Sequence, residues 1–127
     1  MSTTNHGTER IEAERQRQIA VEGWTPAHDD THTKGELFKA AHCYEWHSRT
    51  LLMRGRNCKN PPPGWPWEIA AWKPSNDPAR TLEKAGALYL AEAARCLRAG
   101  LHAQRIDGER RAASCAEQID AISGSRK

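Results

Sequence analysis

Two long segments of the chain carry apolar residues at the three- and four-residue spacing that places them on one face of a helix. In the first segment, about residues 34–53, this stripe consists of Leu37, Ala40, Ala41, Tyr44, Ser48, Leu51 and Leu52. In the second, about residues 78–99, it consists of Leu82, Ala85, Gly86, Tyr89, Ala93, Cys96 and Leu97. The spacing predicts two amphipathic helices whose apolar faces lie in a core.

The residues that flank these segments are typical of helix ends. Thr33 and Glu36 form a capping box, in which each side chain accepts a hydrogen bond from the other's backbone amide. Asp77 suits the cap of the second helix and Pro78 its first position, while Gly100 suits its end.

A further helix is predicted over about residues 9–22, with Thr8 as its cap, and its inward face is unusual. That face carries two apolar and three polar side chains, namely Ile11, Ile19, Arg15, Gln18 and Glu22. Polar residues on the only available inward face of a helix indicate contact with a partner or the wall of a pocket.

The remaining chain completes a mostly α fold. A last helix is predicted over about residues 108–122, and the long segment 54–76 is rich in Pro and Trp, with a short helix at about 67–72. We therefore expect a compact bundle of four or five helices joined by a long Trp/Pro-rich loop. Residues 8–122 form a single domain in this prediction, and residues 1–7 and 123–127 are disordered tails.

Composition limits the classes of function. The 127 residues have a net charge of only +3, without the clustered basic footprint of a nucleic-acid-binding protein. No apolar run approaches the roughly 20 residues that span a bilayer, and the first residues lack the apolar core of a signal peptide. We expect a cytoplasmic protein with no membrane or nucleic-acid partner. Its cysteines, Cys43, Cys58, Cys96 and Cys115, match no zinc module and are expected to be free thiols.

Metal and catalytic motifs are poorly represented. His28, Asp29, Asp30 and His32 offer two imidazoles and two carboxylates, but in a loop that favours turn formation and ligand contact over metal coordination. A second set, His42, Cys43, His47 and Cys58, includes helix neighbours that point in different directions. Nucleophile, phosphate-loop and metalloprotease motifs do not occur. The sequence therefore predicts no catalytic residues, no metal and no cofactor.

Aromatic and basic residues point to binding. Trp24, Trp65, Trp67 and Trp72 offer flat faces on which bases stack, and neighbouring Arg and Lys side chains can hold phosphates. The alternative is that the Trp rings belong to the core and the charges to a solvated surface.

Several short motifs resemble a widespread family of small phage and prophage proteins. They are ERQRQ at 14–18, EGWTPAHDD at 22–30, GEL at 35–37 followed by Ala40 and Ala41, GWPW at 64–67, WKP at 72–74 and LEKAGAL at 82–88. The resemblance covers about residues 10–98. The R…GW…D pattern of residues 17–30 and the alanine-rich helix also resemble ryanodine-receptor-type repeat domains, whose bacterial and phage versions are associated with recognising nucleotide-derived signals. A more distant likeness is to phage MazG-like pyrophosphohydrolases, but the magnesium-binding EExxE and ExxD motifs of that group are absent here.

These resemblances imply a non-enzymatic phage protein that binds and sequesters a nucleotide-derived immune signal, with a homo-oligomeric state expected for so thin a bundle. The expected ligand-binding residues are Arg15, Gln18, Trp24, His28, Asp30, His32, Trp65, Trp67, Lys73 and Lys84. Two alternatives remain open. One is a protein-interaction module that inhibits a host enzyme through its Trp-rich face, and the other is a degenerate MazG-like nucleotide pyrophosphohydrolase.

Overall fold

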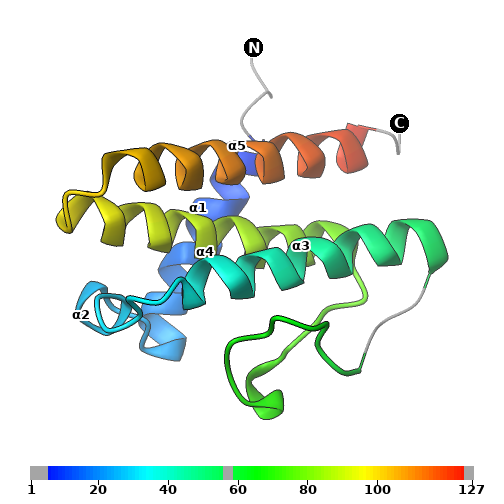
Figure 1. Ribbon diagram of the computed structural model, residues 1–127. Coiled ribbons are helices and arrows are strands. Elements are labelled where there is room, and N and C mark those ends of the chain that lie inside the picture. The colour runs from blue at the N-terminus through cyan, green and yellow to red at the C-terminus, as the bar shows by residue number, and fades with distance from the viewer. Residues whose placement is uncertain (1–5, 56–58, 125–127) are drawn as a thin grey trace.

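The computed structural model describes residues 6–55 and 59–124, and over these residues the fold is helical, without strands (Figure 1). The α-helices are α1 (His6–Glu22), α2 (Pro26–Asp29), α3 (Glu36–Arg54), α4 (Pro78–Arg98) and α5 (His102–Gly124), and a 3-10 turn, η1, spans Ile69–Ala71. The predicted mostly α bundle with a long connecting segment between its second and third long helices is confirmed.

The helix α4 lies at the centre of the bundle. Figure 1 shows α3 and α5 on either side of it, both antiparallel to it, while α1 crosses behind. Of the 21 residues of α4, 13 are buried, so this helix is covered on more than one face. Alanine and glycine fill six of these positions, and such small side chains let several neighbours approach one helix.

Three glycines mark the closest approaches between helices. A Cβ atom at Gly86 of α4 would lie 2.5 Å from Cδ1 of Ile11 on α1. A Cβ at Gly108 of α5 would lie 3.2 Å from the Tyr89 carbonyl oxygen of α4, and one at Gly7 would meet the Ala116 carbonyl oxygen. These contacts fix how α1 and α5 pack on α4 and on each other.

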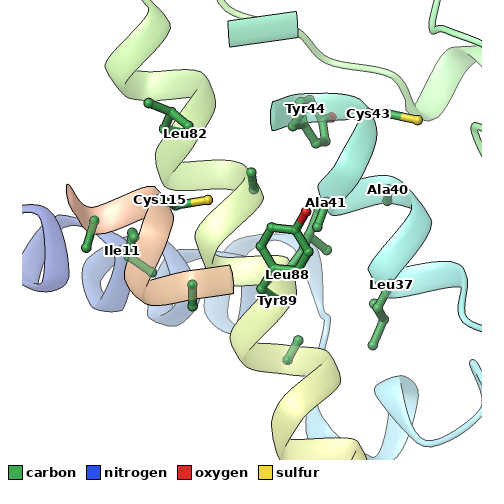
Figure 2. Packing of buried hydrophobic residues seen from close by; sticks show 14 of the residues in the cluster. Ile11, Leu37, Ala40, Ala41, Cys43, Tyr44, Leu82, Leu88, Tyr89 and Cys115 are labelled. Atoms are coloured by element: carbon green, nitrogen blue, oxygen red, sulfur yellow. The ribbon is translucent and has the colours of Figure 1, made fainter. Parts of the chain in front are cut away.

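The core lies between α4 and the helices around it, as Figure 2 shows. Ile11, Leu37, Leu82, Leu88 and Tyr89 are almost fully buried. Cys43, Cys96 and Cys115 are free and buried, as predicted, and burial raises the pKa of each thiol. Cys58 lies outside the described residues.

Several predicted helix boundaries are wrong. The helix α1 begins at His6 rather than after Thr8, and the Gly7 backbone amide donates to Oδ1 of Asp120 on α5 at 2.8 Å. Residues 6 and 7 therefore belong to the fold, and residues 1–5 and 125–127 lie outside the described residues. The helix α5 begins at His102 and not at the predicted Gly108. Gly108 lies inside the helix, at a position of close contact with α4.

The start of α3 also differs from the prediction. Gly35 takes the cap position in a left-handed conformation, with a φ of 79° and no side-chain cap bond. The Glu36 carboxylate accepts from the Lys34 amide at 2.7 Å, so Thr33 is not the cap. By contrast, the Asp77 side chain accepts from the Ala79 amide at 3.0 Å and caps α4 as predicted.

Two shorter segments and two stripe positions depart from the sequence pattern. The short helix expected at 67–72 is the single turn η1, and the loop at 28–32 begins inside α2, which Thr25 caps through the His28 amide. At the ends of the two stripes, Leu52 and Leu97 are each 56% exposed while the adjacent Leu51 and Cys96 are buried, so these two leucines lie at the edge of the covered face.

We expect Gly86→Ala to lower the free energy of unfolding by about 1–3 kcal/mol, the usual cost of overpacking a core. The loss should occur although alanine is favoured over glycine in a helix by about 1 kcal/mol. The cause is the clash with Cδ1 and Cγ1 of Ile11, at 2.5 and 2.8 Å. Chemical denaturation measures the change. In an Ile11→Ala background these atoms are absent, and Gly86→Ala should then stabilise the protein. An equal loss in both backgrounds would contradict the proposed contact.

Candidate functional site

The inward face of α1 is polar, as the sequence predicted. Glu14, Arg15 and Gln18 are 3%, 8% and 2% exposed. Burying such groups costs free energy unless each finds a partner. Their partners, and the atoms that have none, define the candidate site.

Glu14 is the best-satisfied member of this face. Arg17 donates to both of its carboxylate oxygens, at 2.8 and 2.9 Å, and Arg80 of α4 lies 2.7 Å from Oε1. The Gln18 amide donates to Oε2 at 3.1 Å. Burial raises the pKa of the Glu14 carboxyl, but the hydrogen bonds from Arg17 and Arg80 outweigh it and hold the pKa below its ordinary value. Glu14 therefore joins α1 to α4 as an ionised group.

A pocket of about 190 Å³ adjoins this cluster, and we call it the α1 pocket. Its walls come from α1, α3, α4 and the segment that ends in η1. The lining residues are Glu14, Arg17, Gln18, Glu22, Trp24, Tyr44, Ala71, Lys73 and Lys84. Three cations and two carboxylates thus face it, and Trp24 supplies a partly buried aromatic surface.

Three groups on the pocket wall have hydrogen-bonding capacity that the described residues do not use. The Gln18 Oε1 atom is buried without a partner. Lys84 is half-buried and forms no ion pair with the described residues, and burial lowers the pKa of its ammonium group. The Tyr44 oxygen accepts from the Lys73 amide at 3.1 Å, which leaves its proton to donate, and burial raises the pKa of Tyr44 to about 12. Together they offer one acceptor and two donors.

Four tryptophans form a row that divides into structural and pocket members. Trp65 packs against Trp72, with ring centroids 5.0 Å apart, and Trp72 stacks on Tyr44 at 4.7 Å. The Trp65 indole N–H donates to the Glu68 carbonyl at 3.0 Å. At the other end, Trp24 and Trp67 lie 6.0 Å apart. Trp65 and Trp72 therefore serve the core, and Trp24 is the ring that lines the α1 pocket.

A second polar cluster surrounds α2. Arg15 lies 3.4 Å from Oδ2 of the fully buried Asp29, and neither carboxylate oxygen of Asp29 has a hydrogen-bond partner among the described residues. Burial raises the pKa of Asp29, and the charge of Arg15 only partly offsets it. The His32 ring lies 4.9 Å from His28 and 5.3 Å from Trp67. Trp67 thus connects this cluster to Trp24 and the pocket.

The ten residues expected from the sequence therefore divide into groups. Gln18, Trp24, Lys73 and Lys84 line the α1 pocket. Arg15, His28, His32 and Trp67 belong to the α2 cluster beside it or link the two. Trp65 is partly buried and packs against the core beside Trp72. Exposed Asp30 pairs with Arg98 at 2.7 Å, at the C-terminal end of α4.

The ligand-binding residues expected from the sequence omit five lining residues, namely Glu14, Arg17, Glu22, Tyr44 and Ala71, although Glu22 belongs to the polar inward face predicted for the first helix. For Glu14 a signal was available, since it lies one helical turn before Gln18 on the same face. Tyr44 was assigned to the core stripe by its helical spacing. The structure places it in the core, where its ring stacks on Trp72, and also on the wall of the α1 pocket.

The described residues provide neither a metal site nor a membrane-spanning helix. Among residues 6–55 and 59–124, no group of three or more His, Cys, Asp or Glu side chains could hold a metal ion, so the metal alternative at residues 28–32 lacks a ligand set. In the described chain no helix has both the length and the apolar character needed to cross a membrane. Comparison with protein-family models, with curated proteins and with solved structures gave no match.

We expect Glu14→Gln to make the free energy of unfolding less dependent on pH in the acid range. With its pKa held below 4.5, ionised Glu14 stabilises the fold at neutral pH, and this contribution is lost as the pH falls below about 4.5. The variant should lose about 1.5–3 kcal/mol at pH 7, the worth of a hydrogen bond to a charged group. Urea denaturation between pH 7 and pH 3 measures both effects. Exposed Glu12→Gln is the matched control, and an unchanged pH slope in Glu14→Gln would contradict the assignment.

Proposed function

We propose that this protein is a binding protein, not an enzyme, and that its α1 pocket receives part of a nucleotide-like small molecule. Two groups beside the Trp24 ring carry the proposal, and neither has a partner among residues 6–55 and 59–124: the buried acceptor Gln18 Oε1 and the half-buried cation Lys84. A ligand with a planar ring, an N–H group and a negative charge satisfies all three.

The chemistry of each wall supports this ligand class. A nucleobase edge presents N–H donors and carbonyl or ring-nitrogen acceptors, which match Gln18 Oε1 and the Tyr44 hydroxyl. Stacking of a base on an aromatic ring contributes about 1–3 kcal/mol. Lys84, in a partly desolvated position, interacts more strongly with a phosphate than a fully hydrated lysine does.

The size of the pocket limits what it encloses. At about 190 Å³ it is smaller than the roughly 300–1,000 Å³ of sites that enclose drug-sized ligands. We infer that it takes one ring or one anionic group and that the rest of the ligand extends along Lys73 and Trp24 toward Trp67.

The carboxylates of the pocket favour binding over hydrolysis. Glu14 is held by Arg17 and Arg80, and Glu22 lies near Arg17 and Lys73, at 3.3 and 3.7 Å. A general base works best with a pKa near the operating pH, and the lowered pKa of Glu14 makes it a poor one. Both groups act here as partners of cations.

The family resemblance gives the proposal a finer form, in which an oligomeric phage protein sequesters a nucleotide-derived immune signal. A second candidate, a module that blocks another protein, is favoured by the exposed apolar residues of α3, namely Trp46, Leu52 and Met53. The two proposals differ in whether a small molecule binds the free protein.

The test is thermal melting and calorimetry with a panel of cyclic dinucleotides and ADP-ribose derivatives. A ligand at about 100 times its Kd should stabilise the fold by ~2.7 kcal/mol, a shift of several degrees in Tm. Near-isosteric Gln18→Leu and Lys84→Met should abolish the shift, and Lys34→Met, at an exposed site outside the pocket, should retain it. A flat response across the panel, with none of these compounds bound, would overturn the proposal in favour of the protein-blocking module.

We expect Lys84→Met to leave the free protein as stable as before or more stable. Burial lowers the pKa of Lys84, so the charged form costs stability at neutral pH, and this cost is removed by substitution. The free energy of unfolding without ligand, measured by urea denaturation, checks this point. A clear loss of stability in Lys84→Met would show a structural role for the side chain.

A further inference from the structure

A second and larger pocket lies on a different face of α3, and it involves none of the residues of the α1 pocket. We call it the α3 pocket. Its volume is about 530 Å³, within the range of about 300–1,000 Å³ that suits small-molecule sites. One wall is α3, the second is the Pro62–Gly64 turn and the third is Arg111 of α5.

A chain of hydrogen bonds across α3, α4 and α5 holds two of the side chains that line this pocket, His42 and Glu45. The fully buried Tyr89 of α4 donates its hydroxyl proton to Oε1 of Glu45 on α3 at 2.8 Å. Gln118 of α5 donates to the other oxygen of Glu45 at 3.1 Å. The Tyr89 oxygen lies 3.1 Å from Nδ1 of His42. Burial and the Glu45 hydrogen bond raise the pKa of Tyr89, so its hydroxyl stays protonated.

This chain fixes the tautomer of His42. Tyr89 has one proton, and the ionised Glu45 carboxylate can only accept, so that proton lies between Tyr89 and Glu45. Nδ1 of His42 must then carry a hydrogen and donate to the Tyr89 oxygen. Nε2 of the neutral ring is therefore the free acceptor. Phe38 holds the ring edge-on, with centroids 5.0 Å apart, and His42 lines the pocket.

The charges around His42 favour an anion. Lys39, Arg49 and Arg111 line the pocket together with one carboxylate, Glu45. Both oxygens of Glu45 are already engaged by Tyr89 and Gln118, and Arg49 approaches them no closer than 4.0 Å. Lys39 has no ion-pair partner in the described chain. Arg111 forms an ion pair with Asp107, one turn earlier in α5, at 3.1 Å. Arg and Lys side chains arranged in this way bind phosphate oxygens.

We propose that the α3 pocket is a second binding site and that it takes a small phosphate monoester. One proton is shared in the hydrogen bond between the phosphate group and Nε2 of His42, and the other phosphate oxygens accept from Lys39 and Arg49, while the organic part packs against the 41%-exposed Trp46 ring and the Pro62–Gly64 turn. One phosphate group thus meets both the acceptor and the cations. The proposal is independent of the ligand of the α1 pocket.

The test uses phenyl phosphate as the probe, with benzoate and benzyl alcohol as anionic and neutral comparisons. In protein labelled with ¹⁵N at histidine and tryptophan, the free protein should show His42 as the Nδ1–H tautomer. Phenyl phosphate should shift the His42 Nε2 and Trp46 indole signals in a saturable way, with a Kd of about 1 mM or tighter. Arg49→Gln and His42→Gln, at exposed positions, should each weaken binding about tenfold or more, the effect of losing one charge-assisted hydrogen bond.

Two controls separate this site from the α1 pocket and from nonspecific effects. Lys84→Met should bind phenyl phosphate as the parent protein does, whatever ligand the α1 pocket takes. Benzyl alcohol should produce no saturable shift, and benzoate a weaker one. The proposal is overturned if His42 carries its proton on Nε2, if the probe gives no saturable shift, or if Arg49→Gln binds it as well as the parent protein does.

Discussion

The close contact between Gly86 of α4 and Ile11 of α1 is the constraint on which the rest of this fold depends. A side chain at position 86 would push α1 away, because its Cβ would lie 2.5 Å from Ile11. The contact brings the polar half of α1 against α4, where Arg80 and Lys84 lie one turn apart on the same helix. Arg80 thereby reaches Glu14, and Lys84 reaches the pocket beside Gln18. An apolar packing contact thus sets the geometry of the polar site.

The polar face of α1 is partly stabilising and partly costly. Glu14 receives hydrogen bonds from Arg17 and Gln18 and pairs with Arg80 across the helix interface, so its burial is compensated. Gln18 Oε1 is buried without a hydrogen-bond partner among the described residues, and the buried Asp29 carboxylate has its ion pair with Arg15 at 3.4 Å but no hydrogen bond there. Buried polar atoms without hydrogen bonds lower the stability of the fold. At the pocket wall, Gln18 Oε1 keeps a hydrogen-bonding capacity that a ligand can use.

The helix α3 serves a different pocket with each of two faces, and the two sites differ in chemistry. Tyr44 lines the α1 pocket together with the Gln18 amide, the half-buried Lys84 and the Trp24 ring. His42 faces the α3 pocket, where the ring is oriented by Tyr89 and surrounded by exposed cations. The first arrangement suits a base or a similar planar group, and the second suits a phosphate. The two pockets share no lining residue and lie on different faces of α3, so each binds its ligand separately.

The helical class, the stripes of α3 and α4, the Asp77 cap and the polar inward face of α1 could all be predicted from the amino-acid sequence alone. These features depend on residues a few positions apart, whose spacing a helix fixes. Three features become visible only once the helices have packed: Gly108 lies inside α5, Trp24 but not Trp65 lines the α1 pocket, and Tyr89 orients His42. Tyr89 and His42 stand 47 positions apart, and Glu45 and Gln118 stand 73 apart. Such pairs form only when three helices pack, and helical periodicity carries no information about which side chains will then meet.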